Sequence, residues 1–190
     1  ATPGGCERIV HSLRQVDVDN SIIATIDFRN AYNTPSRWAM RKSLVKHGGL
    51  QPLEPLFDLA YGAPSDLLVQ DKGRTLLSAS GKPVVVKSSC GARQGDPLGS
   101  LFFCLVLHDV LVAAAKKYPQ LQILAYMDDI SIVGTRAQSQ LVAECFDLIG
   151  KEAARLQLTI RKDKCEWFSR DAPPAGHGLS DVAHVDPSQA

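Results

Sequence analysis

Asp128 and Asp129 are the side chains of this sequence best placed for metal chemistry. A mostly apolar run over 121–126 precedes the pair, another over 130–133 follows it, and Gly134 ends the second run. This pattern predicts two strands joined by a turn that carries both carboxylates. Two buried carboxylates are costly unless a cation accompanies them, and a divalent metal is a common partner. Asp-Asp is also ordinary turn chemistry, so the pair alone leaves both interpretations open.

A third carboxylate, Asp27, directly follows the apolar run 22–26. That run predicts a buried strand, and the end of such a strand holds a side chain rigidly enough for chemistry. A plain strand-end turn explains a single aspartate equally simply. In an antiparallel sheet this strand can lie beside the 121–134 hairpin, which would bring carboxylates distant in sequence to one edge.

The glycine-rich segment 91–99 precedes a long apolar run. Asp96 is a good N-cap and Pro97 suits a first turn, so a buried helix is expected from residue 98 to residue 117. The free N–H groups at such a helix start can bind an anion, although ordinary helix entry explains the same residues.

The other elements expected from periodicity and turn residues would surround these sites. Thr34 is the expected N-cap of the second helix, with Pro35 at its first position. The expected helices are 7–15, 36–46, 53–61 and 137–155, and the expected strands are 67–69, 84–86, 158–160 and 164–168, the last two pairing with each other. Together they predict a single α+β domain over 1–168, with an antiparallel sheet and helices packed on one face. The Pro/Gly/Ala/Ser-rich segment 169–190 is expected to be a disordered tail.

Bulk properties narrow the class of protein. The net charge of +1 argues against a strongly basic nucleic-acid-binding chain. The five cysteines are scattered without a CxxC pair, which favours a reducing, intracellular environment without disulfides. No membrane-spanning segment and no signal peptide are expected. The chain does not begin with Met and is interpreted as a piece of something longer.

Four stretches, in this order, resemble the palm of reverse transcriptases, most closely the non-LTR retrotransposon type. DFRNAYN (27–33) resembles the first aspartate motif, GARQGDPL (91–98) the GxRQGDPL motif, and YMDD (126–129) the YxDD motif. Residues 156–166 resemble the following motif with its lysine. The resemblance extends over 4–168 and implies a polymerase palm with partial fingers elements, the fingers and thumb being largely missing.

This resemblance implies an RNA-directed DNA polymerase that transfers dNTPs onto a primer 3′-hydroxyl with two Mg²⁺ ions, Mn²⁺ being an alternative. The implied catalytic residues are Asp27, Asp128 and Asp129, and the implied metal ligands are these three with the backbone carbonyl of Phe28. Because neighbouring side chains of extended backbone point in opposite directions, Asp128 is expected to ligate directly and Asp129 more peripherally.

The implied nucleotide-binding residues are Phe28, Tyr32, Arg93, Gln94, Gly95 and Lys164. Tyr32 would lie under the sugar and exclude a ribose 2′-hydroxyl, whereas RNA-templated RNA polymerases typically have an aspartate there. Arg93 is expected either to be structural or to meet phosphate. Lys164 is either a proton donor near the pyrophosphate or a surface lysine.

The implied partners are an RNA template, a DNA primer, dNTPs, and the missing fingers and thumb regions of a longer polyprotein, with no membrane involvement. A nuclear or cytoplasmic location is expected. The isolated chain is expected to have weak or no activity, since few basic residues are available to bind template. The alternative hypothesis is a remnant palm that serves as a non-catalytic nucleic-acid or protein interaction module. A third hypothesis is an RNA polymerase with the same palm, and Tyr32 argues against it.

Overall fold

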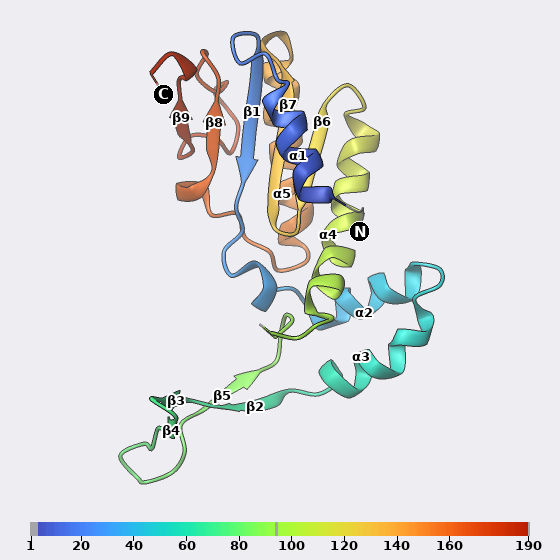
Figure 1. The fold of residues 1–190 in the computed structure, drawn as a ribbon, viewed down its shortest axis with the longest axis vertical. Coiled ribbons are helices and arrows are strands. Elements are labelled where there is room, and N and C mark those ends of the chain that lie inside the picture. The colour runs from blue at the N-terminus through green and yellow to red at the C-terminus, as the bar shows by residue number, and fades with distance from the viewer. Residues whose placement is uncertain (1–3, 94, 190) are drawn as a thin grey trace. The chain divides into compact units, whose positions relative to one another are not determined.

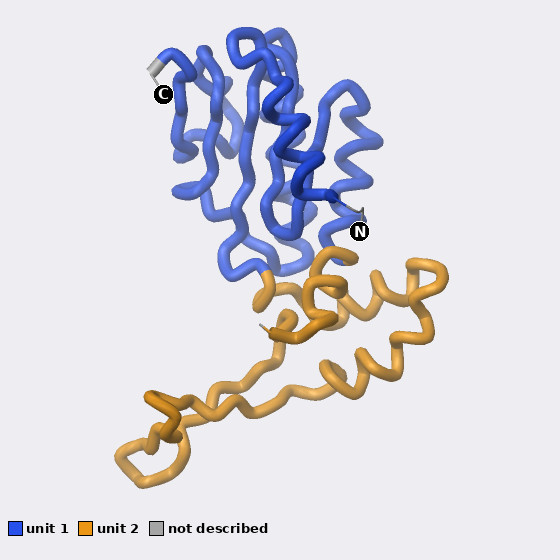
Figure 2. The backbone as a smooth tube through the Cα atoms, viewed as in Figure 1, with its two compact units in different colours: residues 1–31, 106–190 blue, residues 32–105 orange. Residues whose placement is uncertain are grey.

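The computed structural model describes residues 4–93 and 95–189, and the chain divides into two compact units (Figure 2). Unit 1 comprises residues 1–31 and 106–190, and unit 2 comprises residues 32–105. The sequence predicted one domain. Unit 2 has an aromatic cluster of its own, in which Phe57 and Tyr61 contact each other and Phe102 of the long apolar helix.

A five-stranded sheet with the order β6-β7-β1-β8-β9 forms the centre of unit 1 (Figure 1). Its strands are β1 (Ser21–Ile26), β6 (Gln122–Tyr126), β7 (Asp129–Thr135), β8 (Glu166–Phe168) and β9 (Ala183–Val185). All neighbours pair antiparallel except β8 and β9, which run parallel. Alternate residues of β1 are buried, so one face of this central strand belongs to the core.

Helices cover this sheet. Helix α5 (Ser139–Ala154) packs against β1 and β7, whereas α1 (Gly5–Arg14) contacts β6 and has no buried side chain. In Figure 1, α1 crosses in front of the strands and α5 lies behind them. At Gly134 an added Cβ would lie 2.8 Å from Val142 of α5, so glycine allows the close approach of helix and strand. The α+β class predicted from the sequence is confirmed, with helices on both faces of the sheet in place of the one face expected (Figure 1).

The described part of unit 2 contains two α-helices before the start of α4, and two small two-stranded sheets. The helices are α2 (Arg37–Lys46) and α3 (Glu54–Tyr61). The strands are β2 (Ser65–Leu68), which pairs with β5 (Val85–Ser88), and β3 (Gln70–Asp71), which pairs with β4 (Arg74–Thr75). The side chain of Ser36 caps α2 by accepting from Ala39 N–H, so the predicted cap at Thr34 is wrong by two residues.

Helix α4 (Gly99–Lys117) begins in unit 2 and continues into unit 1. Among the described residues it is long and apolar enough to cross a membrane, contrary to the prediction that no segment is. Length and composition alone are weak grounds for a membrane span, because a helix in a protein core can have the same length and the same apolar composition. Phe103, Val106 and Ala114 of α4 are fully buried within the protein.

The predicted pairing of 158–160 with 164–168 is wrong. Both segments instead pair along the same edge of β1 and its continuation. Ile160 forms a single bridge with Phe28, and β8 pairs with Ile23 and Ala24. The free edge of a buried central strand offers more hydrogen bonds and more apolar cover than two short strands offer each other. Trp167 of β8 is fully buried as a result.

The C-terminal segment 169–189 is folded, in contrast to the expected disordered tail. Strand β9 pairs with β8, and both Leu179 and Val182 are buried. Asp147 of α5 accepts hydrogen bonds from Gly178 N–H at 2.9 Å and bonds the His177 ring at 2.6 Å. The Pro/Gly/Ser-rich composition concealed a few apolar residues that are spaced to complete the sheet edge.

Candidate active site

The aspartates of interest lie in unit 1, where β1 ends and the β6–β7 hairpin turns. In the sheet register Ile26 pairs with Ile130, and Tyr126 pairs with Asp129. Extending the first pairing by one residue places Asp27 opposite Asp129. Met127 and Asp128 form the two-residue turn, with Met127 at φ 55° in the left-handed region. The topology therefore brings the carboxylates to one end of the sheet, as the hairpin argument predicted.

Asp128 shares an electrostatic environment with the two other aspartates. Burial raises the pKa of the Asp128 carboxyl, and the nearby charges of Asp129 and Asp27 raise it further. Asp128 and Asp27 are half-buried, whereas Asp129 is exposed. Like charges gathered at one partly desolvated place are unfavourable to each other and favourable to a cation.

The residues at this place fit a magnesium site in donor chemistry. Mg²⁺ takes hard oxygen ligands and is commonly held by one or two carboxylates, with waters and substrate phosphates completing its shell. No group of three or more His, Cys, Asp or Glu side chains within 4–93 and 95–189 is arranged to hold a metal ion. Asp27 and Asp128 supply carboxylate oxygens, the kind of donor that Mg²⁺ prefers.

The hydrogen bonds of the neighbouring residues indicate the direction of the Phe28 backbone carbonyl. Arg29 N–H donates to Thr159 O at 2.9 Å, and Arg161 N–H donates to Asp27 O at 2.8 Å. Because backbone groups alternate along extended chain, the Phe28 carbonyl points to the opposite edge, on which β7 lies. Its ring is buried. Phe28 can therefore contribute a backbone oxygen, while its side chain belongs to the core.

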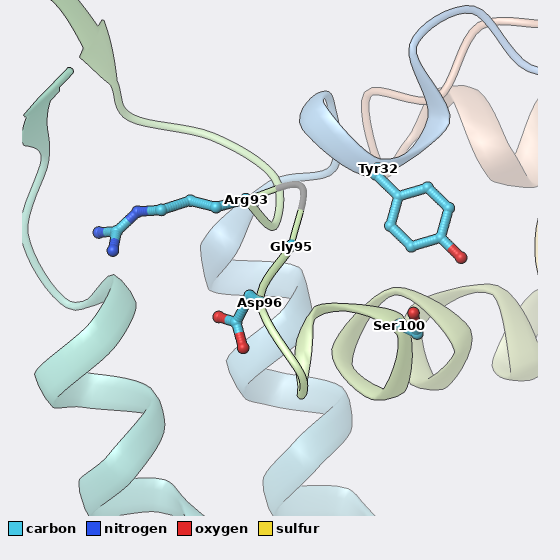
Figure 3. Close-up of a pocket in the computed structure, with 5 residues that line it drawn as sticks. All are labelled: Tyr32, Arg93, Gly95, Asp96 and Ser100. Carbon is cyan, nitrogen blue, oxygen red and sulfur yellow. The ribbon is translucent and has the colours of Figure 1, made fainter. Parts of the chain in front are cut away.

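Three of the candidate nucleotide-binding residues, Tyr32, Arg93 and Gly95, line a cavity of about 230 Å³ in unit 2. Its lining residues are Tyr32, Arg93, Gly95, Asp96 and Ser100. Figure 3 shows the Tyr32 ring extending on the side of α4 where Ser100 lies. Tyr32 stacks on Phe103 with ring centroids 4.7 Å apart, which fixes the orientation of its ring.

The 91–96 loop is held against the segment that carries Tyr32. Gly91 N–H donates to Pro35 O at 2.8 Å, and Ala92 N–H donates to Tyr32 O at 2.7 Å. Gly91 has φ 60°, and an added Cβ there would overlap the backbone of Asn33. Only glycine allows this approach, which explains the first position of the GARQGDPL motif.

Arg93 is engaged within unit 2. Its guanidinium donates to Ala60 O and to Ser65 Oγ, both at 2.8 Å, and lies 5.3 Å from the centre of the Tyr61 ring. In Figure 3 the side chain extends away from Tyr32. Of the two roles considered for Arg93, these contacts favour the structural one.

The other predicted site residues divide between the two units. Gln94 lies outside the described residues, and Gly95 adopts φ 86° at the cavity. Lys164 is exposed in the 3-10 helix Lys162–Lys164 of unit 1. That helix directly follows Arg161, whose N–H bonds Asp27, so Lys164 belongs to the segment attached to the first aspartate.

Sequence reasoning missed two residues that hold this machinery in place. The Tyr61 hydroxyl donates to Asp96 Oδ2 and accepts from Arg93 N–H at 3.2 Å. Cys165, for which the sequence predicted no role of its own within the 156–166 motif, bonds the backbone N–H of Asp27 at 3.4 Å. Neither residue had a local sequence signal, because each acts on a segment more than 30 positions away.

Comparison with known proteins identifies the class of this chain. Residues 10–179 match the family described as reverse transcriptase (RNA-dependent DNA polymerase), and the chain belongs to this family. It is 26% identical over 151 residues to the retrotransposable element SLACS 132 kDa protein of Trypanosoma brucei gambiense, a match that covers 77% of this chain and 12% of that protein.

Solved structures share the fold. A Candida tropicalis telomerase in complex with a fragment of telomeric RNA matches 93% of this chain with a TM-score of 0.58 and 14% identity. An apo telomerase from the same organism matches 88% with a TM-score of 0.59 and 14% identity. The present chain spans 30% and 31% of those chains, respectively, so it corresponds to a minor part of each relative.

Proposed function

We propose that this chain is the catalytic core of an RNA-directed DNA polymerase, which adds dNTPs to a primer 3′-hydroxyl by two-metal nucleotidyl transfer. The observation that carries the proposal is the sheet register, which brings the end of β1 with Asp27 to the β6–β7 turn with Asp128 and Asp129. Membership of the reverse transcriptase family supports the same reaction class.

In this proposal Asp27, Asp128 and the Phe28 carbonyl hold the metal, and the more exposed Asp129 acts peripherally. Bound Mg²⁺ supplies activation of the primer hydroxyl and neutralisation of the leaving pyrophosphate. The rigid sheet contributes by holding both carboxylates at fixed positions before substrate arrives. Lys164 is proposed to donate a proton toward the pyrophosphate from the segment attached to Asp27.

Nucleotide selection is assigned to the unit 2 cavity. Tyr32, held by its stacking on Phe103, is proposed to lie under the sugar and to disfavour a 2′-hydroxyl. Gln94 and Gly95 are proposed to contact the incoming nucleotide and the template base. RNA template, DNA primer and further regions of a longer polyprotein are the proposed partners, in keeping with the 12% of the retrotransposon protein that this chain spans.

Mg²⁺ titration and primer extension with Asp128→Asn test the proposal. The unaltered chain is expected to bind Mg²⁺ or Mn²⁺, and the variant to lose affinity and extension by about 100-fold or more, since a metal ligand matters at least as much as its supporting residues. Asp181→Asn removes the same charge from an exposed position of unit 1 and should leave both values unchanged.

The outcomes separate the alternatives. Incorporation of dNTPs in preference to NTPs supports a reverse transcriptase, whereas the opposite preference supports an RNA polymerase of the same fold. Absence of both metal binding and extension, even with saturating template-primer, would instead support a non-catalytic interaction module.

A further inference from the structure

The backbone of Asp27 lies just beyond the regular sheet. The β1–β7 ladder ends with the pair Ile26 and Ile130, and the β1–β8 ladder ends with Ala24 and Trp167. Between Trp167 and the bridge at Ile160, the neighbouring chain leaves the strand path as a 3-10 helix. Asp27 therefore needs hydrogen bonds from another source if its position is to be fixed.

Cys165 provides the missing bond in a closed ring of three. Asp27 N–H donates to Cys165 Sγ at 3.4 Å, and the Cys165 thiol donates to Arg161 O at 3.4 Å. Arg161 N–H then donates to Asp27 O at 2.8 Å. Both backbone polar groups of Asp27 are thus bonded to the segment 161–165.

The surroundings hold Cys165 firmly. Its exposed fraction is 0%. Its own carbonyl accepts from Ala183 N–H of β9 at 3.3 Å, and the following Glu166 N–H donates to Thr25 Oγ1 at 2.9 Å. Side-chain bonds from β1 and backbone bonds from the folded C-terminal segment therefore replace the ladder where it is interrupted.

We propose that Cys165 is a positioning residue, which fixes the backbone of Asp27 so that its carboxylate is preorganised to bind the catalytic metal. This inference rests on the proposed function, since it assigns Asp27 to metal binding. Cys165 acts on the site through the backbone of Asp27. The same ring connects the backbone of Asp27 to the turn that carries Lys164.

Three variants separate hydrogen bonding from packing. Cys165→Ser keeps a donor and an acceptor, Cys165→Val fills the space without either, and Cys165→Ala leaves space and bonds unfilled. Cys145→Val is the matched control, because Cys145 is also fully buried in unit 1 but lies on α5. Each variant is measured for Mg²⁺ affinity, thermal midpoint and NMR-detected hydrogen exchange at the Asp27 amide.

The positioning role predicts a specific pattern. Cys165→Val should speed exchange at the Asp27 amide by about tenfold and weaken Mg²⁺ binding by about 10-fold or more, the usual effect of removing an outer-shell partner. Cys165→Ser should restore most of both values. Cys145→Val should change the thermal midpoint alone.

Unchanged exchange and unchanged Mg²⁺ affinity in folded Cys165→Val would overturn the inference, as would equal losses in Cys165→Val and Cys145→Val. The exchange measurement does not depend on metal. If the unaltered chain binds no Mg²⁺, the proposed function fails, and so does the assignment of Asp27 on which this inference rests. If Mg²⁺ binds and Asp128→Asn abolishes binding while Cys165→Val does not, only the inference about Cys165 fails.

Discussion

Asp128 carries the conflict between stability and function at the scale of single residues. The same burial and neighbouring charges that suit a cation make its ionised form unfavourable in the folded protein without metal. Functional sites commonly have such local costs, which the surrounding fold must offset. This conflict gives a pH-dependent prediction that does not require any assay of polymerisation.

Asp128→Asn is expected to raise the thermal midpoint at pH 7 in metal-free buffer. Because the pKa of Asp128 in the folded state lies above the ordinary value of 3.8, the folded state binds the proton more tightly than the unfolded state does. Wild-type stability therefore falls as pH rises from that value through the raised pKa. After solvent screening the gain is less than about 1 kcal/mol, or about 4 °C at most.

Calorimetric scans from pH 3 to pH 8 check this expectation. The advantage of the variant should disappear below the ordinary pKa of 3.8, where the carboxyl is protonated in both states. Added Mg²⁺ should reverse the order, because only the unaltered chain gains stability by binding it. A variant that is less stable than wild type at pH 7 without metal would contradict the electrostatic account.

Tyr61 shows how one element positions another within unit 2. It ends α3 and reaches the 91–96 loop, where its hydroxyl bonds Asp96 and the backbone of Arg93. The guanidinium groups of Arg37 and Arg93 lie 5.1 Å and 5.3 Å from the centre of its ring. The loop beside the nucleotide cavity is therefore anchored by a residue that does not line it.

Tyr61→Phe is expected to raise KM for dNTP several-fold with a smaller change in kcat. The substitution keeps the ring and its packing but removes both hydroxyl bonds, at a cost of about 1 kcal/mol in stability. Steady-state kinetics on template-primer measure the split. Tyr118→Phe, which removes a hydroxyl at a site outside unit 2, is the control, and an equal effect of both variants would argue against loop anchoring.

The C-terminal segment is the element for which composition was most misleading. Leu179→Ala is expected to destabilise the chain by about 2–5 kcal/mol, because Leu179 is 1% exposed and its removal leaves a cavity. Urea unfolding measures the loss. Leu59→Ala on α3 is the control, since Leu59 is 85% exposed. Equal stability of the two variants would restore the disordered-tail interpretation.

At the scale of the whole molecule, the charge of the chain is expected to limit its binding to nucleic-acid phosphates. The net charge is +1 at pH 7. Several of the late basic residues are also paired with acids, including Arg155 with Glu152, Arg161 with Asp163 and Arg170 with Asp19. Affinity for nucleic acid increases with the number of phosphates contacted, so template binding by this chain alone should be weak.

The isolated chain is therefore expected to extend a primer distributively, by one or a few nucleotides per encounter. Its affinity for template-primer should be near the non-specific range of about 10⁻⁴–10⁻⁶ M at physiological salt. Primer extension with a trap for free enzyme measures the product length per encounter. Long products in the presence of the trap would refute the hypothesis that this chain is a polymerase fragment with weak activity.

Local patterns in the sequence determined much of the fold. The apolar run before Asp27 gave β1, and the long apolar run after residue 98 gave α4. That helix begins at Gly99, three residues after Asp96, so the predicted cap at Asp96 is too early. Alternating apolar runs around Asp128 gave the β6–β7 hairpin and its carboxylate turn. These features follow from the residues themselves because capping, turn formation and periodic burial act over a few positions along the chain.

Tertiary structure alone decided which distant segments meet. The attachment of β8 and β9 to the edge of β1, the engagement of Arg93 beside Tyr61, and the bond from Cys165 to Asp27 all join segments far apart in sequence. Each depends on competition among many partners of similar local propensity, and burial in the assembled core settles that competition. The sequence by itself thus determined the chemical groups and their local elements, whereas long-range packing decided how those groups are held.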